Sequence, residues 1–244
     1  MRKYANAPVH EVLCEFAFKP SQPWDWTIPG LLYEKIKDQF PTKRQQNVMT
    51  VQLFPASPNQ QPQAESIAKL QFVSADESCI VQVGPDVLTI NQLRPYPGWQ
   101  VFLPTVLEQL DHYRGIGRPA GISSAAVRYL NSVEIGQAHV DLARYFRVVP
   151  RLPDKLPRTF VSMLQQYEVE NTDPPGTLRY VLGTQPHEQP EISAFLLDLA
   201  VHSGEIPFES VETWLNQAHG AVEQAFYLTF TDAAHSEIFG EIKQ

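Results

Sequence analysis

Six charged or titratable residues occupy alternate positions in three apolar, strand-like runs. They are Glu11 and Glu15 in residues 9–18, Arg128 and Glu134 in 124–135, and Asp198 and His202 in 191–202. Because side chains alternate between the two faces of a strand, the six would share the face opposite the apolar residues. A carboxylate beside a histidine orients the ring and raises its pKa, as in general acid–base pairs. If these runs are neighbours and that face is uncovered, it would hold an acid, a base and a cation together.

The same residues also have a structural interpretation. Opposite charges on neighbouring strands are ordinary cross-strand pairs, and one sequence does not show which strands are adjacent. The sequence favours structural or solvated side chains over a catalytic group. The seven histidines are scattered and no C-x-x-C spacing occurs, so we predict neither a metal nor a cofactor.

A basic segment between residues 144 and 158 stands out in an acidic chain. Its cations are Arg144, Arg147, Arg151, Lys155 and Arg158, with Asp154 as the single acid. Pro150, Pro153 and Pro157 forbid a continuous helix, which predicts an extended connection. Such a segment can grip a phosphate, a nucleic-acid end or an acidic partner. The simpler interpretation is a solvated linker whose arginines pair with the protein's own carboxylates.

Motifs that would identify an enzyme are missing from the sequence. It contains no G-x-S-x-G elbow, no P-loop and no H-E-x-x-H. The glycine-rich run 115–121 follows a predicted helix and precedes a predicted strand, the reverse of the dinucleotide-binding order. These observations lower the expectation of an enzyme without deciding the question.

Hydrophobic periodicity predicts the elements that carry these residues. A half-buried strand at 9–18 precedes a helix that Thr27 can cap and that Phe40-Pro41 stops. Four apolar runs separated by turn residues then predict a meander, and a helix follows at 99–114, with Gly115 as a plausible C-cap. The runs are 48–54, 66–73, 79–83 and 87–93. The polar stretch 55–65 has no periodicity and is predicted to be a mobile loop.

The second half repeats this order of elements. It comprises a strand at 124–135, a short helix at 140–146, three strands and a long final helix at 208–230. The three strands are expected at 160–170, 177–184 and 191–202. The pattern predicts an α+β protein, an antiparallel meander sheet with helices packed on one face. Its halves, 1–118 and 119–244, are expected to form one compact unit and are similar in element order to helix-grip or TATA-binding-protein-like folds.

Composition narrows the class of protein. The 244 residues are 43% hydrophobic and 19% charged, as expected for a chain that folds on its own. The net charge of −8 disfavours broad contact with nucleic-acid phosphates, which needs a basic face. Cys14 and Cys79 lie in apolar runs and are predicted to be buried thiols. Because no stretch approaches the roughly 20 apolar residues of a membrane span, and the start lacks a signal-peptide run, we predict a cytoplasmic protein without membrane contact.

Several short motifs resemble those of a known family. They are Tyr4-Ala-Asn-Ala-Pro8-Val9-His-Glu11, the segment 24–31 with sequence WDWTIPGL, Arg128-Tyr129-Leu130-Asn131 and Leu215-Asn-Gln-Ala-His219. Together they resemble a sporadically distributed family of uncharacterised prokaryotic proteins of about this length. The resemblance implies no activity and no catalytic residues. Patchy distribution implies a setting such as phage defence, toxin–antitoxin pairs or CRISPR-associated accessories.

These observations leave three hypotheses about function. The first is a non-enzymatic binding or regulatory module, an accessory of a prokaryotic defence or toxin system. It would hold a protein partner through the sheet face or the basic segment, and homo-oligomers are compatible with it. The second is an enzyme or sensor that binds a small anionic ligand, such as a nucleotide, near Arg128, Glu11 and Glu15. The third is a nucleic-acid contact through residues 144–158.

Overall fold

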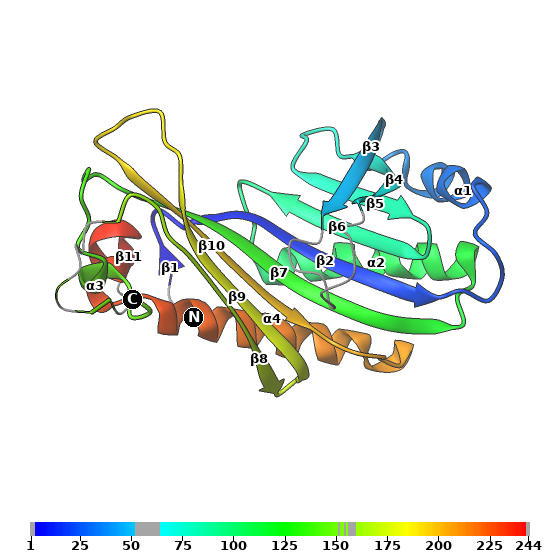
Figure 1. The fold of residues 1–244 in the computed structure, drawn as a ribbon. Helices are drawn as coiled ribbons and strands as arrows, with labels where there is room; N and C mark the ends of the chain where they lie inside the picture. The colour runs from blue at the N-terminus through cyan, green and yellow to red at the C-terminus, as the bar shows by residue number, and fades with distance from the viewer. Residues whose placement is uncertain (1–2, 52–63, 151, 154, 156–159, 243–244) are drawn as a thin grey trace. The chain divides into compact units, whose positions relative to one another are not determined.

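Figure 1 shows the fold in a computed structural model that describes residues 3–51, 64–150, 152–153, 155 and 160–242. Side chains are described for these residues except 3, 46–51 and 64–68. The described part holds a nine-stranded sheet with the order β3-β4-β5-β6-β2-β7-β10-β9-β8 and a two-stranded sheet of β1 and β11. In each half of the chain, the first long strand therefore neighbours the last strand of the following meander.

The elements have the following bounds. The strands are β1 (Lys3–Tyr4), β2 (Val9–Lys19), β3 (Thr42–Val51), β4 (Ala64–Val73), β5 (Cys79–Gly84), β6 (Val87–Leu93), β7 (Gly121–Ile135), β8 (Leu164–Thr172), β9 (Pro175–Gln185), β10 (Ser193–His202) and β11 (Glu241–Ile242). The α-helices are α1 (Thr27–Ile36), α2 (Trp99–Gly117), α3 (Leu142–Tyr145) and α4 (Val211–Thr229). A 3-10 turn, η1 (Phe208–Ser210), precedes α4, and a π-helical turn, η2 (Ala234–Ile238), follows it.

The chain divides into two compact units. Unit 1 comprises residues 1–12, 126–204 and 209–244, and unit 2 comprises 13–125 and 205–208. Unit 2 takes most of 1–118 and unit 1 most of 119–244. The strands β2 and β7 contribute residues to both units.

Unit 2 buries the apolar side of its strands under α1 and α2. In β2, Cys14, Phe16 and Phe18 are all less than 5% exposed, because the alternating side chains point to the helix-covered face. The ring of Phe18 stacks on Tyr113 of α2, with centroids 4.5 Å apart. Tyr33 of α1 packs against Phe72 of β4. These aromatic contacts fix both helices on one face of the unit.

Unit 1 is built around α4, which packs against β10. The apolar stripe predicted for the last helix is buried there, with Trp214, Leu215 and Val222 all 6% exposed or less. On the strand side, Leu197 and Leu199 of β10 are fully buried. Odd-numbered residues of β10 therefore face the helix, and even-numbered residues face away from it.

The two ends of the described chain meet within unit 1. β1 pairs with β11 in antiparallel fashion, Tyr4 opposite Glu241. The hydroxyl of Tyr4 shares a hydrogen bond of 2.8 Å with Nδ1 of His235, which is 2% exposed. Phe226 and Phe239 pack around the same tyrosine. This pairing is not predictable from the sequence, because two-residue strands carry no periodicity.

The α+β class and the antiparallel sheet are confirmed. The likeness of the halves to helix-grip or TATA-binding-protein-like folds stays a prediction. The expected loop at 55–65 lies mostly outside the described residues. No helix in the described ranges is long and apolar enough to cross a membrane.

Two helix boundaries differ from the prediction. Thr27 does not cap α1. Instead, Oδ1 of Asp25 accepts a hydrogen bond from the amide of Thr27 at 2.8 Å. The helix α2 continues past Gly115 to Gly117 and ends at Arg118, whose φ is 45°. A left-handed residue ends a helix most cheaply when it is glycine. Three glycines stand close to this end, so the sequence does not specify which position closes it.

Candidate functional site

Arg128, Asp198 and Arg179 form an ion cluster on the face of unit 1 that points away from α4. Nε and Nη2 of Arg128 donate to the two carboxylate oxygens of Asp198, both at 2.7 Å. Nη1 of Arg179 donates to Oδ2 of the same carboxylate at 3.1 Å. The side chain of Asp198 is 5% exposed, whereas those of Arg128 and Arg179 are 35% and 30% exposed.

Strand register explains why these three meet. Ala200 of β10 lies opposite both Arg128 of β7 and Arg179 of β9, so all three point to the same face. Asp198 stands two residues earlier in β10 and shares that face. The small side chain of Ala200 leaves room for both guanidinium groups to reach the carboxylate diagonally.

The structure brings together only some of the six residues predicted for the face. Glu134 lies opposite Ala194, and His202 lies opposite Ala126. Each position is four residues along β10 from Asp198, about 13 Å at the rise of a strand. Arg179 is not among the residues predicted for this face, because the sequence alone does not show that β9 lies beside β10. The described contacts therefore assemble an ion pair network and bring no histidine to Asp198.

The two glutamates from β2 have separate surroundings. Glu11 belongs to unit 1 and is half-buried. Glu15 belongs to unit 2, where its Oε2 accepts from the hydroxyl of Thr89 at 2.9 Å and from Nζ of Lys69 at 3.3 Å. Thr89 is 2% exposed, so this carboxylate satisfies a buried hydroxyl. The role of Glu15 that these contacts support is structural.

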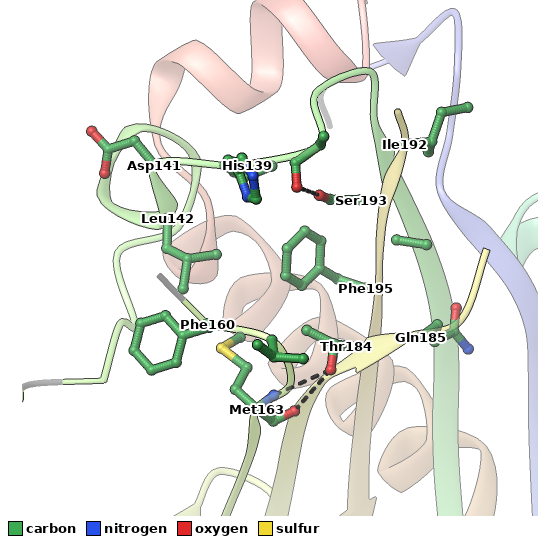
Figure 2. A pocket seen from close by; sticks show the side chains of 14 residues that line it. His139, Asp141, Leu142, Phe160, Met163, Thr184, Gln185, Ile192, Ser193 and Phe195 are labelled. Atoms are coloured by element: carbon green, nitrogen blue, oxygen red, sulfur yellow. Dashed lines mark hydrogen bonds between the residues drawn. The ribbon is translucent and has the colours of Figure 1, made fainter. Parts of the chain in front are cut away.

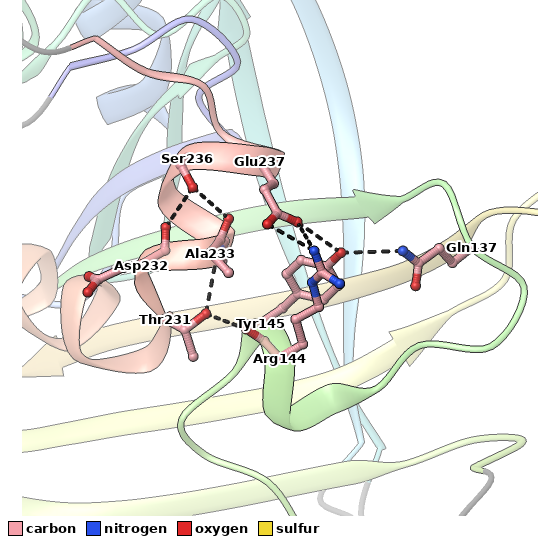
Figure 3. A network of polar contacts seen from close by, with 9 residues as sticks. Gln137, Arg144, Tyr145, Thr231, Asp232, Ala233, Ser236 and Glu237 are labelled. Carbon is pink, nitrogen blue, oxygen red and sulfur yellow. Dashed lines mark hydrogen bonds and ion pairs between the residues drawn. The ribbon is translucent and has the colours of Figure 1, made fainter.

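The described arginines of the basic segment pair with acidic residues of the same unit. Nη2 of Arg144 donates to both oxygens of Glu237, at 3.0 and 2.8 Å (Figure 3). Arg147 lies 3.6 Å from a carboxylate oxygen of Asp232. Lys155 is exposed, and Arg151 and Arg158 lie outside the described residues. For Arg144 and Arg147, the contacts match a linker whose charges are balanced internally.

A cavity of about 340 Å³ opens in unit 1 at one end of β9 and β10 (Figure 2). Phe160, Leu142 and Met163 line it together with the buried ring of Phe195. His139 adds an imidazole, and the lining residues that the structure describes include no lysine or arginine. The cavity is large enough for a small ligand, but these described residues provide no cation for a phosphate or a carboxylate.

β8 forms one edge of the sheet and is the most exposed strand whose side chains are described. Within the described part of the chain it pairs with β9 alone, and Figure 1 shows it at the margin of its sheet. Leu164 is 72% exposed, Tyr167 47% and Val169 49%. The six described residues 164 and 166–170 are all exposed. A nine-residue edge strand with three exposed apolar side chains is a template for pairing with another strand.

One contact identifies which main-chain atoms of β8 face the free edge. The amide of Thr184 donates to the carbonyl oxygen of Met163 at 3.0 Å, so Met163 points toward β9. In an antiparallel pair, alternate residues direct both their N–H and C=O groups to the same side. Odd-numbered residues of β8 therefore bond to β9. Gln166, Glu168 and Glu170 direct their amides and carbonyls outward.

Burial favours the neutral form of three titratable side chains, Cys14, Cys79 and His219. Burial raises the pKa of the Cys79 thiol to about 12 and raises that of Cys14 further. Both cysteines are free and buried, as predicted. Burial lowers the pKa of His219 to about 4, and its Nδ1 shares a hydrogen bond of 2.8 Å with the hydroxyl of Tyr129. Among the described residues, no group of three or more His, Cys, Asp or Glu side chains could hold a metal ion.

No protein-family model matches this chain, and no curated protein matches it. Among the sites described above, the open edge of β8 has main-chain groups that no strand of the described residues pairs with.

Proposed function

We propose that the protein is a binding module that holds an extended segment of a protein partner by strand addition at β8. The observation that carries the proposal is the exposed nine-residue edge strand, in which alternate residues turn their N–H and C=O groups outward. In this recognition mode, main-chain hydrogen bonds supply affinity and the side chains flanking them supply specificity. The proposal keeps the protein partner expected from the sequence and assigns a different surface to it.

Ion pairs within the protein make the sheet face around Arg128 and the basic segment less suitable for binding a partner or ligand. Arg128 makes a two-pronged contact to Asp198, and a ligand anion would compete with that buried carboxylate. Arg144 and Arg147 have acidic partners of their own. The edge of β8 does not require a broken ion pair before it can bind. The defence or toxin-system setting rests on the resemblance alone and identifies no partner.

Proline substitution at an outward position tests strand addition. Gln166→Pro removes an amide that points to the free edge and leaves the ladder to β9 intact, which edge strands tolerate. Gln166→Ala is the matched control, because it removes the same side chain and keeps the amide. Tagged full-length protein would be purified from its native host as wild type and as both variants.

The proposal expects one protein to copurify in near-stoichiometric amount with the wild type and Gln166→Ala, and to be lost with Gln166→Pro. Urea unfolding of the three proteins shows whether each is folded. Retention of the partner by folded Gln166→Pro would show that it binds elsewhere.

A further inference from the structure

The side chains of β8 give its edge a distinct charge. The strand reads LQQYEVENT, with two glutamates and no lysine or arginine. Glu168 and Glu170 are exposed and, being two residues apart, lie on the same face. Among the described residues neither has an ion-pair partner. Arg179 of β9 lies opposite Glu168 of β8, but its guanidinium donates a hydrogen bond to Asp198.

The opposite face of the same edge is apolar. Tyr167 and Val169 alternate with the two glutamates, and about half of each side chain is exposed. A strand that pairs with β8 places its own side chains directly beside these residues, about 5 Å away. The complementary strand carries cations on one face and apolar side chains on the other.

We infer that the segment added at β8 is a strand of a different protein in which lysine or arginine alternates with large apolar residues. The cations would lie beside Glu168 and Glu170, and the apolar residues beside Tyr167 and Val169. This inference rests on the proposed function and specifies the chemistry of its partner.

Strand register argues against a second copy of β8 as the occupant. An antiparallel self-pair centred on Glu168 or on Glu170 sets that residue opposite itself, and one centred on Val169 sets Glu168 opposite Glu170. A self-pair centred on Tyr167 sets Glu170 opposite Leu164. No register supplies a cation, because β8 contains none. Like charges placed opposite one another destabilise strand pairs.

Synthetic peptides test the inference with the full-length protein. The probe is an eight-residue peptide that alternates lysine with valine or tyrosine and carries a fluorophore. One comparison peptide has glutamate in place of lysine, and another has the same composition as the probe without alternation. Two cross-strand ion pairs predict that the probe binds about tenfold more tightly than either comparison peptide, measured by fluorescence anisotropy.

Charge reversal provides a matched control. E168K/E170K should reverse the preference, so that the acidic peptide binds more tightly than the basic one. E188K/E191K changes the net charge by the same amount at exposed positions between β9 and β10 and should leave the preference unchanged. If both double variants changed the preference for the basic peptide equally, the preference would reflect general attraction to an acidic protein, and the inference would be overturned.

The remaining outcomes separate the inference from the proposed function. If the acidic peptide binds as tightly as the probe and Gln166→Pro abolishes both, strand addition holds and the charge inference is wrong. A wild-type dimer that Gln166→Pro converts to a monomer would make a second copy the occupant. Binding that is insensitive to Gln166→Pro, or no binding of any peptide, would overturn the proposed function itself.

Discussion

The amide of Thr184 donates to the carbonyl of Met163 at 3.0 Å, and this contact indicates which way the main-chain groups of β8 point. Odd-numbered residues bond to β9 and even-numbered residues face the free edge. Strand addition requires that the even-numbered residues face outward. The same orientation determines how a proline at each position changes the free energy of unfolding.

Proline is expected to have different effects at adjacent positions of β8. Tyr167→Pro removes an inward amide and breaks the ladder to β9, so it should lower the free energy of unfolding by about 3 kcal/mol. Gln166→Pro should cost less than about 1 kcal/mol, because its amide has no strand to bond. Urea unfolding compares the two. Equal losses would mean that the inward and outward residues are assigned wrongly.

The ion cluster should matter for stability more than an exposed pair does. Arg128→Leu leaves the carboxylate of Asp198 buried with Arg179 as its one described partner, and we expect a loss of about 3 kcal/mol. Arg144→Leu is the matched control, because Arg144 and Glu237 are both about half exposed, and it should cost less than about 1 kcal/mol. Similar losses in chemical unfolding would contradict a structural role for Asp198.

The sequence predicted the order of the four α-helices and of the nine strands of the large sheet, because hydrophobic periodicity is local, but it did not predict the short strands β1 and β11. The face shared by Arg128 and Asp198 followed from alternation alone. The third member, Arg179, depended on which strand neighbours β10, and that is set by the path of the chain. The edge position of β8 is hidden for the same reason, since its residues have ordinary strand character.

His219 should make the protein less stable in mild acid. Its pKa in the folded state is about 4, below the value of 6.5 for a free histidine, because burial disfavours the charged ring. The unfolded chain therefore binds the proton more readily, and stability falls as the pH drops from about 6.5 toward 4. Between pH 7 and pH 5, wild type should lose about 2 kcal/mol more than His219→Gln, measured by urea unfolding. An identical loss would show that the ring is protonated in the fold.

Gly176 in β9 should not tolerate a side chain. A Cβ atom there would lie 2.1 Å from the carbonyl oxygen of His202, a main-chain atom that cannot rotate away. Gly176→Ala should therefore lower the free energy of unfolding by about 3 kcal/mol. Gly204→Ala is the control, because its Cβ would meet nothing within 4 Å. Thermal unfolding of both variants checks the difference, and an unchanged Gly176→Ala would contradict the close approach of these strands.

Residue-resolved hydrogen exchange tests strand addition at β8 most directly. Amide exchange would be followed by NMR in the full-length protein, with and without the alternating lysine peptide at saturation. The account predicts that the amides of Gln166, Glu168 and Glu170 exchange rapidly in the free protein and become protected when the peptide binds, whereas Tyr167 and Val169 are protected in both states. Saturation of the protein without new protection at those three amides would contradict it.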